Sequence, residues 1–343
     1  MRRDPAGRGL VSHPAIERAL PPSQLEHAAN SLSETGQSVA IVTGFCIVDA
    51  DPQAAETDGP PGAVYLAAAL SRLGMEVTLV SDDYGRPLVE ACLMARGLSR
   101  IPLECVPFEA GQPNEPARAQ DSAEHDTRTD AWVDAFLANC AGKLTHLIAI
   151  ERPSPSHTVE SLVAQRRAGQ PPVERFCLEV PEHDRNACHN WRGVDINGYT
   201  AKTHRLFEEV TRRRLGVTTI GLADGGNEIG CGSIPWETLC ATAPTGAASR
   251  VAARIATDFT ILAGVSNWAA YALAISVAHV RDRIDVIEPL DVESERGVIE
   301  LLVRQAGACD GVTRLRQATV DGLPLETYLQ ALVAMRAVAG LRT

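Results

Sequence analysis

Six short apolar runs, each followed further along the chain by a segment of helical character, constrain the fold of this sequence most strongly. The runs lie at residues 38–43, 76–81, 103–107, 145–150, 218–223 and 258–263. Their length and their content of Val, Ile and Leu predict strands that are buried on both faces. Strands that alternate with helices favour an α/β fold, in which a largely parallel sheet carries helices on both faces in a three-layer sandwich. We expect helices at residues 64–73, 87–95, 132–141, 202–215, 234–241, 267–280, 291–306 and 324–338.

The domain organisation follows from where this pattern begins and where it is interrupted. Residues 1–35 carry several prolines and precede the first strand, so we expect an N-terminal leader without a chemical role. Residues 36–343 then form a single α/β domain. Within this domain, residues 108–129 are rich in Gly, Pro, Asp and Glu and lack apolar periodicity, which predicts a surface loop. Residues 154–197 are also weakly periodic and are expected to cover one edge of the sheet.

Composition restricts the partners and the compartment. The sequence has 32 Lys and Arg against 43 Asp and Glu, a formal charge of -11, which argues against a nucleic-acid partner. Nine cysteines without a Cys-x-x-Cys pair indicate a reducing compartment. The apolar stretch 259–280 is broken by Gly264 and Asn267, which favours strand, turn and helix over a membrane span. We therefore expect a cytoplasmic protein with no membrane partner and a small-molecule substrate, and the sequence leaves a homo-oligomer open.

Polar side chains follow the ends of several predicted strands. Asp82 and Asp83, then Glu151, then Asp224, and finally Asn267 each come directly after a strand or its turn. Because ligands of parallel sheets bind outside the carboxyl ends of the strands, we expect these side chains to share one crevice. Carboxylates gathered in a crevice repel one another unless a cation is present, either a divalent metal or a bound ammonium group. The alternative is that some of them cap the following helix, and we expect this for Asp82 or Asp83.

The loop 224–232 has the composition of a metal site. It combines the oxygen donors of Asp224, Asn227 and Glu228 with glycines that permit close approach of the backbone to a ligand. Oxygen-rich, thiol-poor sites suit Mn²⁺ or Mg²⁺. We predict a divalent metal held by Glu151, Asp224, Asn227 and Glu228.

A second glycine-containing loop leads into the helix expected at 64–73. Residues 57–63 read Thr-Asp-Gly-Pro-Pro-Gly-Ala, and proline is favoured in the first turn of a helix. The amides of a helix N-terminus can bind an anionic group. As a lone motif this signal is weak, because many turns between a strand and a helix need Gly and Pro for their geometry.

Six segments together resemble the D-glutamate cyclase C-terminal domain family. They are 57–63, 151–153, 192–196, the Asp-Gly-Gly-Asn-Glu-Ile-Gly stretch at 224–230, 266–268 and 319–326. The resemblance runs from about residue 39 to residue 326, and Asp321 is singled out by it alone. Two positions depart from the family pattern, because Trp191 and Cys231 stand where methionine is usual. Both changes adjoin the predicted site.

The resemblance implies an enzyme that converts D-glutamate to 5-oxo-D-proline, a cyclase of the lyase type, in a D-glutamate-cyclase-like domain. On this hypothesis a metal polarises the γ-carboxylate, a further carboxylate accepts protons from the amino group, and arginine binds the other carboxylate. The catalytic candidates are Glu151, Asp195, Asp224 and Glu228. The substrate-binding candidates are Asp58, Gly59, Gly62, Arg152, Arg192, Gly225, Gly226, Asn227 and Asn267.

Two other functions use the same residues. Some stand-alone relatives resemble Mn²⁺-dependent phosphatases, and a phosphorylated metabolite would use the same donors as a carboxylate. A non-catalytic module that binds a small molecule is the third reading. A nucleotide-binding oxidoreductase is disfavoured because no Gly-x-Gly-x-x-Gly follows the first strand. The sequence does not decide among the cyclase, the phosphatase and the binding module, and it does not identify the metal or show whether a separate partner domain is required.

Overall fold

The computed structural model describes residues 3–11, 13–108, 123–140, 142–242 and 246–342. Its centre is a six-stranded sheet whose strands lie in the order β5-β4-β1-β6-β7-β8, with every neighbouring pair parallel. The predicted strands and the three-layer α/β class are thereby confirmed. The strands are β1 (Ser38–Thr43), β4 (Glu76–Ser81), β5 (Leu103–Cys105), β6 (Leu144–Ile150), β7 (Thr218–Ala223) and β8 (Phe259–Leu262).

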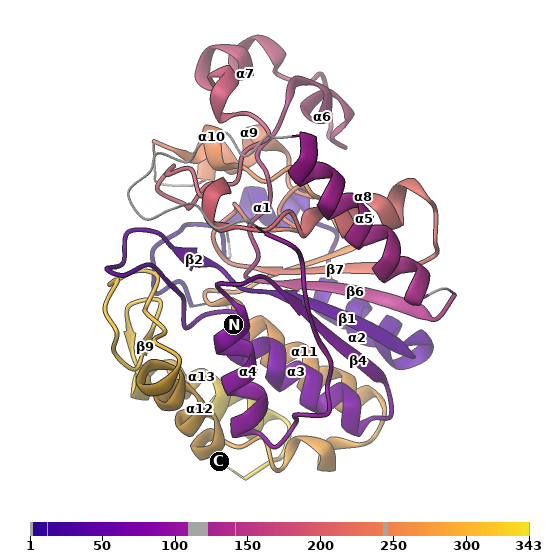
Figure 1. Ribbon diagram of the computed structural model, residues 1–343, viewed down its shortest axis with the longest axis vertical. Helices are drawn as coiled ribbons and strands as arrows, with labels where there is room; N and C mark the ends of the chain where they lie inside the picture. Colours follow the sequence, from indigo (N-terminus) through magenta and orange to yellow (C-terminus); the bar gives the residue numbers. More distant parts are fainter. Residues whose placement is uncertain (1–2, 12, 109–122, 141, 243–245, 343) are drawn as a thin grey trace.

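Both faces of the sheet are buried, as the continuous apolar runs predicted. In β1, Val39 and Ile41 belong to one core, while Ala40 and Val42 belong to the core on the opposite face. The first core is covered by α2, α3, α4 and α11 with α12 and α13 outside them, and the second by α5 and α8. Figure 1 shows these two helical layers on either side of the strands. Their bounds are α2 Gln24–Thr35, α3 Pro60–Arg72, α4 Arg86–Ala95, α5 Ala123–Asn139, α8 His204–Arg212, α11 Ser266–Val280, α12 Val292–Gln305 and α13 Leu325–Val338.

Two of the expected helix starts differ by four residues or more from those observed. Helix α3 begins at Pro60, four residues before the expected start, because Gly59 precedes it with a φ of 97° and two prolines fit its first turn. Helix α5 begins at Ala123, so the expected surface loop 108–129 is wrong over its last part. Residues 109–122 of that expected loop lie outside the described residues.

The expected leader is part of the folded domain. Helix α2 packs against α11 and β8, and α1 (Pro14–Ala19) packs against α9 (Trp236–Thr242). The weakly periodic region 154–197 contains two short α-helices, α6 (Val159–Ala164) and α7 (Val173–Glu179). It contributes no strand to the six-stranded sheet. Among the described residues, no helix combines the length and the apolar character needed to cross a membrane.

The strand order places a crevice at the carboxyl ends of β1 and β6. From β1 the chain proceeds to β4 and β5 on one side and later to β6, β7 and β8 on the other. The connections of neighbouring strands therefore leave in opposite directions at the β1–β6 boundary, which opens space for a ligand. Two hairpins contribute residues to this end of the molecule, β2–β3 (Cys46–Ile47 and Ala54–Ala55) and β9–β10 (Thr319–Val320 and Leu323–Pro324).

Candidate active site

The acids at the ends of β6 and β7 lie together. Glu151 follows β6 and Asp224 follows the neighbouring parallel strand β7, while Glu228 comes from the loop beyond Asp224. One carboxylate oxygen from each of the three lies within 4.8 Å of the others, and all three residues are buried. The expected convergence of Glu151, Asp224 and Glu228 is thus observed in the structure.

A second group of carboxylates shares Asp224. Asp58, Asp224 and Asp321 also present oxygens that lie within 4.8 Å of one another. Asp321 occupies the turn of the β9–β10 hairpin with a φ of 52°, and the buried Asp310 fixes this turn by accepting a hydrogen bond from the Gly322 amide at 2.8 Å. Segments far apart in the sequence therefore build one continuous acidic cluster.

Glycine 225 allows Glu228 to fold back over its own loop. The Gly225 amide donates to Glu228 Oε1 at 2.8 Å, and a Cβ at this position would lie 2.7 Å from the same oxygen. Gly226 has a φ of 91°, a conformation that favours glycine. Both glycines permit a tight loop, as predicted, but the Gly225 amide is bonded to Glu228, which gives it a role inside the protein.

The loop 57–63 does not have the free amides that an anion would need. Asn267 Oδ1 accepts hydrogen bonds from the Gly59 amide at 3.0 Å and from the Gly62 amide at 2.7 Å. Asp58 accepts from the amides of Ser266 and Asn267, both at 2.8 Å, at the start of α11. The expected anion-binding role of Gly59, Gly62 and Asn267 is therefore replaced by a structural one, because these groups satisfy one another.

Arg8 of the N-terminal segment enters the acidic cluster. Its guanidinium forms an ion pair with Asp224, and it donates to Asp321 Oδ1 at 3.1 Å and Oδ2 at 3.2 Å. The expected leader thus places a cation in the candidate site, a contact that the sequence did not predict. The sequence signal is the Gly7-Arg8-Gly9 triplet, whose glycines have φ values of 64° and 77°.

One guanidinium does not balance the surrounding acids. Burial, followed by repulsion from neighbouring carboxylates, raises the pKa of Glu56 and of Glu151 well above the ordinary range. Burial also raises the pKa of Asp224 despite its contact with Arg8. Burial and Asp321 raise the pKa of Asp58 to about 8, against the opposing effect of its backbone hydrogen bonds. The site therefore favours additional positive charge or bound protons.

A narrow cavity of about 20 Å³ adjoins the acids. Glu56, Glu151, Asn227 and Arg192 line it, with Trp191 beside them. The Arg192 guanidinium lies 5.3 Å from the centre of the Trp191 ring, and Nη2 donates to Val312 O at 3.2 Å. Arg192 therefore remains a candidate for binding a substrate carboxylate. Arg8 also lines the cavity and helps to keep it small.

Two predicted site residues have other roles in the structure. Arg152 is buried and donates to Asp82 Oδ2 at 2.6 Å, to Thr203 Oγ1 at 2.9 Å and to two backbone carbonyls. These bonds use its donors inside the protein, and the expected contact of Arg152 with substrate is not supported. Asp195 is exposed, lies outside both carboxylate groups and accepts from the Asn197 amide at 2.8 Å. Its carboxylate caps a turn, and its expected catalytic role is not supported.

Asp82 has a structural role, although it does not cap α4 as expected, because the N-cap residue of that helix is Gly85. Its Oδ1 accepts from the Gly85 amide at 3.1 Å, directly before α4, and its Oδ2 pairs with Arg152. Asp82 therefore fixes the turn that precedes α4. Asp83 is exposed and pairs with Arg86 across 3.6 Å. Neither residue belongs to the two carboxylate groups.

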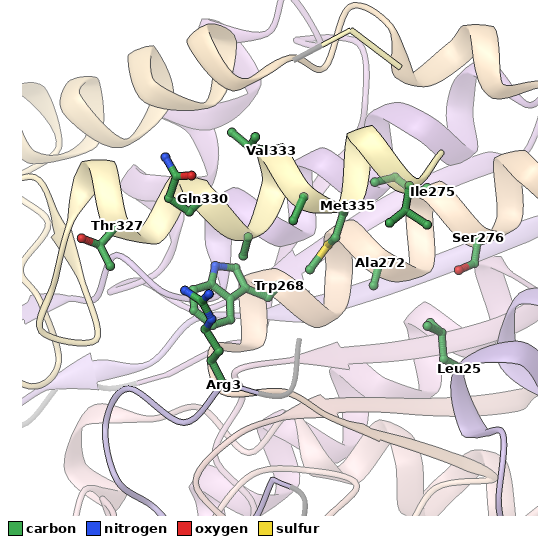
Figure 2. A pocket seen from close by; sticks show the side chains of 13 residues that line it. Arg3, Leu25, Trp268, Ala272, Ile275, Ser276, Thr327, Gln330, Val333 and Met335 are labelled. Carbon is green, nitrogen blue, oxygen red and sulfur yellow. The ribbon is translucent and has the colours of Figure 1, made fainter. Parts of the chain in front are cut away.

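A wider hollow lies elsewhere, between α11 and α13. It has a volume of about 590 Å³, and side chains such as Trp268 of α11 and Met335 of α13 line it (Figure 2). None of its described lining residues is acidic. This hollow can accept apolar groups, but it lacks the donor set that a metal or a reacting carboxylate would need. The narrow acidic cavity is therefore the better candidate for chemistry.

The comparison with family models decides the relationship of the chain. The model described as "D-glutamate cyclase-like, C-terminal" matches residues 1–167 and 175–336. The chain belongs to this family. The match begins at residue 1, so it includes the segment that carries Arg8. Among curated proteins, human "D-glutamate cyclase, mitochondrial" is 29% identical over 277 residues, which cover 80% of this chain and 37% of the human protein. The chain thus corresponds to little more than a third of that relative's length.

Proposed function

We propose that this chain catalyses the cyclisation of D-glutamate to 5-oxo-D-proline with the loss of water. The observation that supports this most directly is the pair of buried carboxylate groups that share Asp224, in a chain of the D-glutamate cyclase-like family. The substrate carries an ammonium group, which an acidic site attracts, and a γ-carboxylate, which needs positive charge to become an electrophile. The acidic residues would attract the ammonium group directly. A bound metal would supply the positive charge that the γ-carboxylate needs.

The residues of the site fit a divalent cation. Glu151, Asp224 and Glu228 supply oxygens within 4.8 Å of one another. Asp224 Oδ1 is buried without a hydrogen-bond partner among the described residues. Hard cations such as Mn²⁺ and Mg²⁺ bind oxygen donors of this kind. When bound, such a cation supplies Lewis-acid polarisation of the substrate γ-carboxylate.

We assign proton transfer to Glu56. It lies outside both carboxylate groups, lines the cavity beside Glu151, and has a pKa raised by burial and by Glu151. A raised pKa makes a carboxylate a stronger base. As the substrate nitrogen bonds to the γ-carboxyl carbon, the ammonium group gives up two protons and one carboxyl oxygen leaves with them as water. Glu56 accepts the first proton and returns it to the departing oxygen, while Arg192 holds the α-carboxylate.

The Glu56 assignment is tested by Glu56→Gln. The amide cannot accept the proton, so we expect kcat to fall on the order of 10²-fold. Mn²⁺ affinity, measured by calorimetry, should change little because Glu56 is outside the proposed ligand set. If E56Q kept the wild-type kcat, Glu56 would not be the general base and another residue would accept the proton.

The phosphatase alternative has lost the anion site expected at residues 57–63, because Asn267 occupies the Gly59 and Gly62 amides. A phosphate dianion would also approach several buried carboxylates. These two observations favour the cyclase.

The decisive assay uses metal-stripped protein and D-glutamate, with and without Mn²⁺, and follows 5-oxoproline together with the loss of primary amine. We expect product with Mn²⁺, little without it, and a slower reaction of L-glutamate. Absence of product from protein that is folded by circular dichroism would refute the proposal. Thermal stabilisation by D-glutamate without turnover would instead identify a binding module.

A further inference from the structure

We propose that residues 4–11 and 13–20 form a plug over the active site, and that Arg8 holds the place of a divalent cation at a second site formed by Asp58, Asp224 and Asp321. The proposed function uses the neighbouring group of Glu151, Asp224 and Glu228 for its metal. Only the metal at this first site rests on the proposed function. The second site and its closure follow from separate contacts.

The second carboxylate group has the arrangement of a cation site. Its three buried residues come from the loop after β3, from the end of β7 and from the β9–β10 turn, and their oxygens lie within 4.8 Å of one another. Asp224 is common to both groups, so its two oxygens can face two cations. Pairs of metal ions about 3.5–4 Å apart, held by shared carboxylates, recur in hydrolytic enzymes.

Arg8 occupies this group without satisfying it. Its guanidinium contacts Asp224 and Asp321, yet Arg8 Nε is buried without a hydrogen-bond partner among the described residues. Asp224 is 1% exposed, and apart from the ion pair of Oδ2 with Arg8, neither of its carboxylate oxygens has a hydrogen-bond partner in the part of the chain that the structure describes. A carboxylate can accept about four hydrogen bonds or coordinate a metal. The unmet capacity of Asp224 points to a ligand other than the guanidinium.

Besides the polar contacts of Arg8, the segment that carries it is held by a turn of its own and by an apolar cluster. Asp4 accepts from the Arg8 amide at 2.9 Å and from the Gly9 amide at 2.8 Å, which folds the segment into a compact turn. Leu10 and Ile16 then pack in a small apolar cluster with Trp236. This cluster is separate from the two cores that flank the sheet. The segment can therefore leave the site while the sheet and its helices stay intact.

Arg8 and a divalent cation exclude each other. Both require the oxygens of Asp224 and Asp321, and two positive centres at these oxygens repel strongly in a buried environment. Withdrawal of Arg8 would also enlarge the cavity of about 20 Å³ that it lines, which at present has room for about one water molecule. The plug thus couples access of substrate to binding of the second cation.

The test is the stoichiometry of Mn²⁺ binding by equilibrium dialysis. We compare wild type, Arg8→Gln and the control Arg18→Gln, which removes the same charge from an exposed position on α1. We expect R8Q to bind one more Mn²⁺ per chain than wild type or R18Q. The double variant R8Q/D321N should lose this additional ion, because it lacks one ligand of the second site.

A second variant keeps every charge. Leu10→Ala weakens the anchoring of the plug and leaves Arg8 in place, so it should raise Mn²⁺ affinity at the second site at least threefold. Saturating Mn²⁺ should also accelerate tryptic cleavage after Arg8 in wild type. Equal Mn²⁺ stoichiometry in wild type, R8Q and L10A, with unchanged cleavage, overturns the plug and leaves the proposed function standing. If neither wild type nor R8Q binds Mn²⁺, both the plug and the proposed metal-dependent function are overturned.

Discussion

Asp224 is the residue on which the candidate site depends most. It belongs to both carboxylate groups, it is 1% exposed, and it holds Arg8. It also ends β7, so the parallel pairing with β6 places it beside Glu151. No other residue of the cluster combines these positions.

The first prediction concerns Asp224→Asn. The amide keeps the size of the side chain but removes a shared anionic ligand, so cyclase turnover should fall on the order of 10²-fold or more. Initial rates of 5-oxoproline formation at saturating Mn²⁺ measure the effect. Asp83→Asn, at an exposed acid outside the cluster, is the matched control and should retain wild-type rates. Retained activity in D224N would remove Asp224 from the mechanism.

Glu151 carries local backbone strain at the same site. Its φ is 44°, a region that residues other than glycine seldom adopt, and such conformations cost on the order of 1–3 kcal/mol. Ser266 holds the side chain by donating to Glu151 Oε2 at 2.6 Å. The strained backbone directs the carboxylate toward Asp224 and Glu228, which fits a functional position.

At the scale of elements, the contact between the starts of α3 and α11 supports the acidic cluster. The Asn267 side chain, at the start of α11, accepts hydrogen bonds from two amides of the segment that begins α3. The Asp58 carboxylate in turn accepts hydrogen bonds from two amides at the start of α11. The two helix starts are thus locked together. Asp58 is thereby fixed beside Asp224.

The second prediction tests this contact between the two helix starts with Gly62→Ala. A Cβ at Gly62 would lie 2.6 Å from Asn267 Oδ1 and 2.8 Å from Asn267 Cα, too close for either helix to keep its place. We expect a loss of about 1–3 kcal/mol in the free energy of unfolding. Gly297→Ala is the control, because it lies inside α12 with no atom within 4 Å of an added Cβ. It should stabilise by about 0.5–1 kcal/mol.

Denaturant unfolding of both alanine variants gives the comparison. Because Gly62 lies beside Asp58, G62A should also weaken Mn²⁺ binding, whereas G297A should not. Equal stability of G62A and wild type would show that the helices can separate without cost at this point.

At the scale of the whole molecule, buried histidines make stability depend on pH. Burial lowers the pKa of His146 to about 4, and burial followed by repulsion from Arg167 and Arg254 lowers that of His157 to about 3. The pKa of His204 is lowered for the same reasons of burial and nearby arginines. In the unfolded chain these groups titrate near 6.5. Their stabilising contribution is therefore complete above pH 6.5 and is lost as the pH falls toward 3.

The third prediction uses His157→Gln. The variant removes one of these titrations, so the stability advantage of wild type over H157Q should shrink as the pH falls from 6.5 to 4. For a single titrating group, this difference in the free energy of unfolding can change by at most about 1.4 kcal/mol per pH unit. Chemical unfolding at several pH values measures it, with the exposed His279→Gln as control. Parallel curves for wild type and H157Q would contradict a neutral, buried His157.

The apolar runs determined the sheet, because strands buried on both faces leave an uninterrupted hydrophobic signal, and the acids after them located Glu151, Asp224 and Glu228. The prediction failed for Arg152, whose partners Asp82 and Thr203 lie far away in the sequence, and for Asp195, whose carboxylate caps a local turn. Arg8 was missed because its only local signal is the Gly7-Arg8-Gly9 triplet, and Glu56 because it lies just outside the 57–63 segment.

Local sequence thus determined the secondary structure, the fold class and which acids end the central strands. Tertiary structure decided which of these charges face one another, because charge pairing depends on distance in space. The contact of Arg8 with Asp321 joins residues 313 positions apart. No pattern of spacing along the chain encodes that meeting, and it arises only when the N-terminal segment and the β9–β10 hairpin pack at the same end of the sheet.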